Sequence, residues 1–239
     1  MGKMKNKVLI IVPAYNEEGK IGKVLREIKN YASSILVVDD GSSDRTYTEA
    51  KAEGVKVIRH NKNLGIGRVY MDAIRYALEN KYDTCLHIAA DMQDDPKDIP
   101  RFISKIEEGY DYVQGSRYMV GGKRVNHPVF RTLTTFIYSL FFSLIVGRRV
   151  TDGSNGYRAY RTDIFKNGRI DLWKNWLDRY ELEPYMYYHV IKRGFRWGEL
   201  GVKKMYPRDR MVGYTKMRPF IDWWRIVKPL IYLKLGLRK

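Results

Sequence analysis

The sequence predicts an α/β protein built on a mainly parallel β-sheet that is flanked by helices. Two observations lead to this fold class. Short apolar runs alternate with segments of helical periodicity through the first half of the chain, and polar motifs follow the apolar runs. Ligands of parallel sheets bind at the carboxyl ends of the strands, where these motifs fall. The 239 residues are enough for one medium-sized domain with a sizeable core.

Five apolar runs in the first half are expected to be strands buried on both faces, because each run is short and continuous. They lie at residues 8–12, 35–38, 55–58, 86–90 and 112–113. Helices are predicted between them, since apolar residues recur with helical spacing in residues 21–28, 66–78 and 99–106. Right-handed crossovers are expected to join the strands.

From about residue 120 onward the chain is predicted to be helical, aromatic and basic, with one further strand pattern at residues 195–202. Residues 203–239 hold 11 Lys and Arg against 2 Asp and Glu, so their net charge is 11 − 2 = +9 of the total +17. Such a surplus indicates an anionic partner: nucleic acid, a membrane surface or a phosphorylated substrate. The single cysteine, Cys85, excludes a disulfide framework and a cysteine-based zinc site.

No segment is predicted to span a membrane. The longest apolar run, residues 136–146, has 11 residues, whereas a spanning helix needs about 20. Residues 133–145 form one apolar helical face, which fits either core packing or a helix lying in the membrane interface. The aromatic and basic tail suits a membrane surface, so we expect peripheral attachment to the cytoplasmic face of the membrane.

Polar motifs close the first three strands. They are Pro13-Ala14-Tyr15-Asn16-Glu17, Asp39-Asp40-Gly41-Ser42-Ser43-Asp44 and Asn61-Lys62-Asn63-Leu64-Gly65. Asp39 and Asp40 suit hydrogen bonding to a base or ribose at a strand end. Ser43 and Asp44 are expected instead to cap the helix that follows.

The fourth strand ends in Ala89-Ala90-Asp91-Met92-Gln93-Asp94-Asp95-Pro96. Asp91 and Gln93 point the same way in an extended chain, and hard oxygen ligands at that spacing suit Mg²⁺ or Mn²⁺ bridging a diphosphate. Asp95 is expected to cap the helix that starts near Pro96.

Three function classes are disfavoured by their missing motifs. The segment from Gly65 to Tyr70 lacks the third glycine of a dinucleotide fingerprint and follows the third strand, and no phosphate-binding P-loop is present. The sequence shows no RNP, KH or zinc-finger pattern, and a set of carboxylates repels nucleic-acid phosphates. We therefore expect no dehydrogenase, no ordinary NTPase and no nucleic-acid partner.

Taken together, the four strand-end motifs resemble glycosyltransferase family 2, whose GT-A fold has a Rossmann-like, mainly parallel sheet. Three further motifs are similar to the polyprenyl-phosphate group of that family, to which dolichol-phosphate mannose synthases and their glucosyl relatives belong. These are Gly115-Ser116-Arg117-Tyr118, Asp152-x-x-x-Gly156-Tyr157-Arg158 and Arg210-x-x-Gly213-x-Thr215-Lys216. The likeness runs from about residue 7 to residue 217.

The resemblance implies inverting transfer of a hexosyl group from GDP-mannose or UDP-glucose to a polyprenyl or dolichyl phosphate. The alternative is transfer to a hydroxyl of a polysaccharide, glycolipid or other saccharide. The resemblance also implies a catalytic domain over residues 1–217, with a nucleotide-sugar half (1–120) and an acceptor half (120–217). A helical, basic and amphipathic membrane-surface segment is expected at 218–239, and a separate membrane-anchoring subunit is a partner that this arrangement allows.

The resemblance also assigns roles to residues. The nucleotide sugar is expected to contact Pro13, Tyr15, Glu17, Asp39, Asp40, Gly65, Asp91, Arg210 and Lys216, with Asp39 on the base and with Arg210 and Lys216 over the diphosphate. Asp91 and Gln93 are the implied ligands of Mg²⁺ or Mn²⁺. Arg117 and Arg131 would hold the acceptor phosphate, near Thr135. The implied catalytic set is Asp91, Arg117, Arg131, Asp152 and Arg210.

One position departs from the family pattern, which has Asp-x-Asp where this chain has Ala89-Ala90-Asp91. Activity is expected to survive, because the second carboxylate is generally the closer metal ligand.

A phosphate acceptor, with a second pKa of about 6, is largely anionic near neutral pH and needs orientation more than a general base. A hydroxyl acceptor would need a base, for which Asp152, Asp178 or Glu181 are available.

Overall fold

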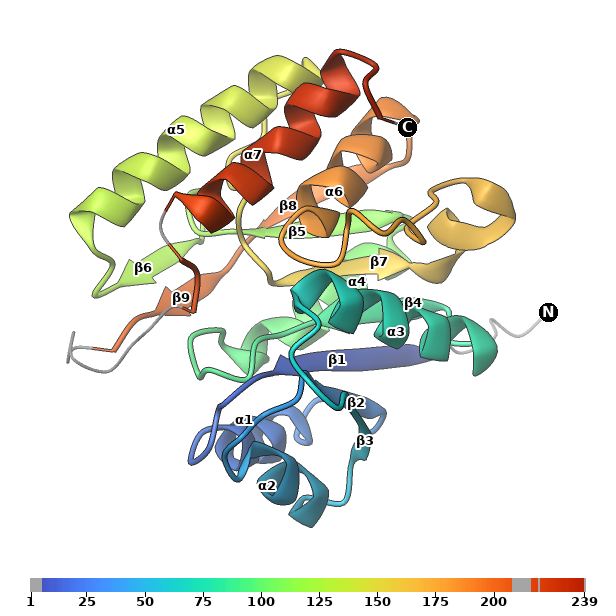
Figure 1. Cartoon of the computed structure of the whole chain (residues 1–239), viewed down its shortest axis with the longest axis vertical. Coiled ribbons are helices and arrows are strands. Elements are labelled where there is room, and N and C mark those ends of the chain that lie inside the picture. Colours follow the sequence, from blue (N-terminus) through green and yellow to red (C-terminus); the bar gives the residue numbers. More distant parts are fainter. Residues whose placement is uncertain (1–5, 208–215, 219, 239) are drawn as a thin grey trace.

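A seven-stranded sheet forms the centre of the molecule in the computed structural model, which describes residues 6–207, 216–218 and 220–238 (Figure 1). The strand order is β3-β2-β1-β4-β7-β5-β8. The strands are β1 (Val8–Ala14), β2 (Ile35–Asp39), β3 (Lys56–Arg59), β4 (Thr84–His87), β5 (Tyr112–Ser116), β7 (Arg158–Arg161) and β8 (Trp197–Gly201). Only β7 pairs antiparallel with its neighbours in this sheet. The predicted mainly parallel α/β sheet is confirmed.

Helices cover both faces of the sheet and enclose two separate cores. The helices are α1 (Ile21–Ile28), α2 (Thr46–Ala52), α3 (Ile66–Glu79), α4 (Ile99–Glu107), α5 (Val129–Val146), α6 (Leu182–Lys192) and α7 (Ile221–Lys234), with short 3₁₀ turns at Pro96–Asp98 and Thr162–Gly168. Alternate residues of β1 serve opposite faces, because side chains alternate along a strand. Leu9 and Ile11 pack with α3, α5 and α6, whereas Ile10 and Val12 pack with α1 and α4.

Three strands fall in the part of the chain that was expected to be mainly helical. These are β7 and the two-stranded parallel pair β6 (Lys123–Val125) and β9 (Lys203–Met205). None of them carries an apolar run. The β7 strand includes Arg158, which is 1% exposed and donates a 2.5 Å hydrogen bond to Glu183. Burial of a paired charge therefore replaced the apolar pattern on which the prediction depended.

The α5 helix is longer than the 11-residue apolar run from which it was predicted, because it begins at Val129 and includes Arg131. Among the described residues it is the one helix long and apolar enough to cross a membrane, by length and composition alone. That no segment spans a membrane therefore stays a prediction. One side of the helix belongs to the core, where Tyr138 and Phe142 are buried. The α7 helix lies beside it and also packs on α6 (Figure 1).

Candidate functional site

The loops that follow β1 and β2 are joined by hydrogen bonds at the carboxyl edge of the sheet. The hydroxyl of Ser42 accepts a 2.9 Å bond from the backbone N–H of Asn16, and that of Thr46 accepts a 2.6 Å bond from the N–H of Glu17. The N–H of Ser43 donates to the side-chain oxygen of Asn16. Ser43 therefore joins the loops and does not cap α2, which corrects the expectation. Asp44 does accept a 2.9 Å bond from the N–H of Thr46 at the start of α2.

Asp39 and Asp40 are both buried, and both have partners within the chain. Asp39 accepts hydrogen bonds from the N–H and hydroxyl of Ser42, and its second oxygen lies 3.1 Å from Nε of Arg59. Asp40 accepts bonds from the N–H groups of Leu64 (2.8 Å) and Gly65 (2.9 Å). The Asp40 carboxylate thus holds the loop after β3 in place, and Gly65 lies at the same edge as Asp39.

His60 completes this arrangement behind Asp40. Its Nδ1 lies 2.7 Å from Asp40, and its Nε2 lies 3.2 Å from Asp72 on α3. The hydrogen bond to Asp40 raises the pKa of His60 above its ordinary value; burial opposes the shift, and the negative charges of Asp40 and Asp72 add to it. His60 therefore links the strand-end carboxylate of Asp40 to Asp72 on the helix.

Glu17 and Lys216 meet across 199 residues of sequence. The Nζ of Lys216 lies 2.6 Å from Oε1 of Glu17 and also donates to the backbone carbonyls of Tyr15 and Asn16. Lys216 thus reaches the loop after β1, and Pro13 lies close by in the last two residues of that strand. Arg210, predicted to lie over the same edge, falls outside the described residues.

Asp91 and Gln93 lie in a turn after β4, where Oδ1 of Asp91 accepts a 3.0 Å bond from the backbone N–H of Gln93 and Met92 has a φ of 65°. The chain is therefore not extended here, in contrast to the expectation from the spacing of the two residues. Burial raises the pKa of Asp91, and the charges of Asp94 and Glu17 raise it further, against the opposing effect of Lys204. In the described part of the chain, no three His, Cys, Asp or Glu side chains are placed to hold a metal ion. The two oxygen donors present suit a cation shared with phosphate oxygens, since Mg²⁺ keeps few protein ligands.

Lys204 was not predicted as a site residue. It is buried beside the segment that carries Asp91 and Gln93. Its Nζ lies 2.8 Å from Oδ1 of Asp94, whose side chain is fully buried. Burial works against the charged ammonium, but Asp94 and Asp91 outweigh it and raise the pKa of Lys204. The signal in the sequence was weak, because a lysine in a basic tail is normally a solvated residue.

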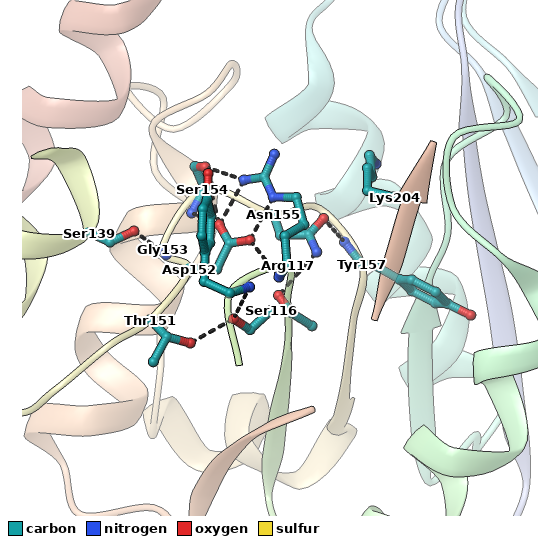
Figure 2. Close-up of polar contacts among 12 residues, drawn as sticks. Ser116, Arg117, Ser139, Thr151, Asp152, Gly153, Ser154, Asn155, Tyr157 and Lys204 are labelled. Atoms are coloured by element: carbon teal, nitrogen blue, oxygen red, sulfur yellow. Dashed lines mark hydrogen bonds and ion pairs between the residues drawn. The ribbon is translucent and has the colours of Figure 1, made fainter. Parts of the chain in front are cut away.

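Arg117 forms a buried, two-pronged ion pair with Asp152 (Figure 2). Its Nε lies 2.6 Å from one carboxylate oxygen and its Nη2 lies 2.7 Å from the other. Further bonds join Arg117 to Ser154 and to the hydroxyl of Tyr206. Arg117 is 4% exposed and Asp152 is fully buried. Most of the guanidinium donors are therefore bonded within the chain. The main role of Arg117 is to hold Asp152, Ser154 and Tyr206 in place, and few of its donors are left for a ligand.

Two tyrosines connect Arg117 to further arginines near the start of α5. The ring of Tyr206 lies 5.3 Å from the guanidinium of Arg131, and the ring of Tyr118 lies 4.6 Å from that of Arg124. Arg131 and Arg117, both predicted from sequence, thus meet around Tyr206. Tyr206, Tyr118 and Arg124 were not predicted as site residues. The cluster of Arg117, Tyr118, Arg124, Arg131 and Tyr206 is called the arginine cluster below.

The pKa of His127 is affected by the positive charge of the arginine cluster. Burial, followed by the positive charges of Arg117 and Arg131, lowers its pKa to about 4. Its Nδ1 lies 2.7 Å from the hydroxyl of Thr132. Within the described chain, Nε2 of His127 and the hydroxyl of Tyr118 are buried without a hydrogen-bond partner. A positive potential and unsatisfied polar atoms are what an anion-binding site requires.

The chain is similar to known proteins over most of its length. A family profile described as glycosyl transferase family 2 matches residues 9–169. An undecaprenyl-phosphate mannosyltransferase of Micrococcus luteus is 32% identical over 88% of this chain and 87% of its own length. A UDP-N-acetylglucosamine–dolichyl-phosphate N-acetylglucosaminyltransferase of Methanococcus voltae is 29% identical over 96% of each chain.

Among solved structures, the glucosyl-3-phosphoglycerate synthase of Mycobacterium tuberculosis, in complex with Mn²⁺, UDP and phosphoglyceric acid, has a similar fold. The TM-score is 0.68 with 17% identity, over 98% of this chain and 80% of the other. At 17% identity, this likeness shows a shared fold alone. The profile covers more than half of the chain and the relatives extend over nearly all of it. The chain is therefore a glycosyltransferase of family 2 that resembles the polyprenyl-phosphate mannose synthases.

Proposed function

We propose that this glycosyltransferase moves a hexosyl group, with inversion, from GDP-mannose or UDP-glucose to a polyprenyl or dolichyl phosphate at the cytoplasmic face of a membrane. One observation carries the proposal: the arginine cluster lies at the N-terminal end of α5, next to an exposed apolar face of the same helix. That face consists of Val129, Phe130, Leu133, Phe136, Ile137, Leu140 and Leu144, which are between 52% and 85% exposed. A phosphate head and an apolar tail match these two surfaces.

The head group is argued from charge. Arginine forks bind phosphates through paired hydrogen bonds. Arg131 lies in the first turn of α5, where the helix dipole adds positive potential. The low pKa of His127 and the unpartnered hydroxyl of Tyr118 support an anion in this position. Because a phosphate monoester is already an anionic nucleophile near neutral pH, orientation and charge neutralisation by Arg131 are the main requirements.

A hydroxyl acceptor would need a general base, and two of the three candidate acids are held in ion pairs. Asp152 is held by Arg117, and Glu181 lies 2.7 Å from Nζ of Lys228. A buried carboxylate in an ion pair is a poor general base, because accepting a proton would leave its partner's charge uncompensated. Of the three acids considered for this task, Asp178 remains. These pairings favour the phosphate acceptor.

The donor would lie at the carboxyl edge of the sheet, against Pro13, Tyr15, Glu17 and Asp39, with Asp40 and Gly65 shaping the loop behind it. Lys216 and Arg210 would neutralise charge on the leaving diphosphate. Asp91 and Gln93 would hold Mg²⁺ or Mn²⁺, and a bound cation would stabilise the same charge. The named relatives, which use polyprenyl or dolichyl phosphates, and the Mn²⁺–UDP complex of the solved neighbour support this arrangement.

Attachment to the membrane would combine the apolar face of α5 with the basic C-terminal part of the chain. Residues 203–239 carry a net charge of 11 − 2 = +9, and anionic lipids attract such segments. A separate membrane-anchoring subunit remains a further partner to be tested by co-purification.

The test is a two-donor, two-acceptor assay. Radiolabelled GDP-mannose and UDP-glucose are each offered with a short polyprenyl phosphate and with the dephosphorylated alcohol. We expect transfer from one donor to the phosphate alone; equal transfer to the alcohol would refute the phosphate acceptor. Asp91→Ala should abolish the stimulation of transfer by added Mg²⁺ or Mn²⁺, and stimulation equal to that of the unmodified chain would refute the role of Asp91.

Arg131 allows a sharper test of the acceptor site. Arg131→Gln should raise the KM for polyprenyl phosphate while leaving the KM for the donor unchanged. Arg149→Gln is the matched control, because Arg149 is exposed just beyond the other end of α5. Equal effects of the two substitutions would contradict the assignment.

A further inference from the structure

Lys204 is held firmly in place beside the predicted cation ligands. It lies in the middle of β9, whose backbone pairs with β6 on one side and with Asp94 on the other. The N–H of Met205 donates a 2.9 Å bond to the carbonyl of Gln93. The ammonium is thus fixed by backbone contacts to the segment that carries Asp91 and Gln93.

The carboxylates in this region are unevenly available. Asp94 uses Oδ2 to accept a 3.2 Å bond from the N–H of Ala89 and Oδ1 to pair with Lys204. Ala89 itself carries no carboxylate. Asp91, by contrast, accepts a hydrogen bond from the N–H of Gln93, and the lysine is bonded to Asp94 instead. An ammonium thus lies on the strand that is hydrogen-bonded to the segment of the predicted cation ligands.

We propose that Lys204 is a positioning residue that acts as a built-in counter-charge for the donor site. By pairing with Asp94 it withholds that carboxylate from a metal ion, and its own charge stabilises the donor diphosphate in part. The chain therefore binds a divalent cation weakly and depends on it weakly for transfer. This inference rests on the proposed donor site after β4 and adds the residue that sets its cation requirement.

The decisive measurement is Mn²⁺ binding by the full chain without donor or acceptor, followed by electron paramagnetic resonance. Lys204→Met leaves Asp94 buried without its partner, so Mn²⁺ should bind about 10-fold more tightly than to the unmodified chain. Lys204→Arg keeps the charge and should leave binding weak. Adding Asp94→Asn to Lys204→Met should remove the gain. Equal binding by the Met and Arg variants would overturn the proposal.

A second variant keeps the proposal testable if Lys204→Met does not fold, which circular dichroism would show. Ala89→Asp restores a second carboxylate beside Asp91 and should tighten Mn²⁺ binding about 10-fold with Lys204 in place. No change in binding would count against the proposal. Because neither titration requires sugar transfer, their results are independent of whether the acceptor is a polyprenyl phosphate.

The transfer assay supplies the remaining readout. The unmodified chain should keep a large part of its rate in the presence of a chelator, whereas Lys204→Met should require added Mn²⁺. A loss of about 100-fold or more on chelation of the unmodified chain would refute the built-in counter-charge, even if the polyprenyl-phosphate acceptor were confirmed.

Discussion

At the scale of single residues, Arg117 has a structural task that its motif did not reveal. Both oxygens of Asp152 are bonded to its guanidinium, and both side chains are buried. Arg117→Ala should lower the free energy of unfolding by about 3–5 kcal/mol, because it leaves a buried carboxylate without its partner. Urea unfolding followed by circular dichroism measures this change.

Arg131 provides the comparison for that prediction. It is half-buried against the ring of Tyr206, so Arg131→Ala should cost about 1 kcal/mol or less. If Arg117→Ala were as stable as Arg131→Ala and altered only the KM of the acceptor, Arg117 would be a substrate-binding residue and the structural assignment would be wrong.

His60 predicts a pH dependence of stability. Its pKa is raised in the folded chain, first by the hydrogen bond to Asp40, so the protonated form stabilises the fold. This contribution is complete below the ordinary pKa of 6.5 and is lost as the pH rises through the raised value. Unfolding free energies measured from pH 6 upward should therefore fall more steeply for the unmodified chain than for His60→Gln. Parallel pH profiles would contradict this assignment.

At the scale of elements, α3 lies so close to the segment before α6 that only glycine fits at one position. A Cβ on Gly67 would lie 1.9 Å from the carbonyl oxygen of Leu177 and 2.5 Å from that of Arg179. Gly67→Ala should therefore destabilise the fold by about 1–3 kcal/mol or more, since backbone atoms cannot yield as a side chain can. Thermal unfolding measures the effect.

The matched control is Gly22→Ala in α1. A Cβ there would meet side-chain atoms of Arg26 and Glu53 at 3.4 Å, which is an ordinary contact. Alanine is the better helix former, so this substitution should be neutral or stabilising by up to about 1 kcal/mol. Similar losses in both variants would mean that the close approach at Gly67 does not exist in solution.

At the scale of the whole molecule, charge and apolar surface are expected to act together at a membrane. Phe136 and Leu140 are exposed on α5, and replacing both with serine should weaken binding to phosphatidylserine vesicles about 10-fold or more at any salt concentration. Raising NaCl to about 1 M should remove the electrostatic part, because the Debye length falls to about 3 Å. Vesicle sedimentation measures both effects.

Tyr31→Ser is the control for that experiment, because Tyr31 is an exposed aromatic residue that follows α1, a helix on the opposite face of the sheet. Its vesicle binding should equal that of the unmodified chain. Binding that is unchanged by the α5 substitutions, or equally reduced by Tyr31→Ser, would show that α5 is not the membrane-facing surface.

Local pattern predicted the parts of the fold in which apolar residues repeat with a fixed period. The strands β1 and β2 and the helices α1, α3 and α4 follow the predicted ranges closely, because each buries a continuous apolar stripe. The β3 strand also forms where it was predicted, but the expectation that it is buried on both faces was wrong: it is an edge strand in which Lys56 and Arg59 are exposed. Prediction failed for β7, whose buried Arg158 is compensated by Glu183, a residue 25 positions away. The periodicity of apolar residues cannot predict a strand whose burial depends on a charged partner far away in the sequence.

The sequence by itself determined the family, the parallel sheet and the polar residues at its carboxyl edge, since these depend on short motifs and their order along the chain. Only the tertiary structure decided which charges neutralise one another: Arg117 with Asp152, Lys216 with Glu17 and Lys204 with Asp94. The physical reason is that each pair joins residues 35 to 199 positions apart. Electrostatic interaction depends on distance and burial in space, neither of which the order of residues contains.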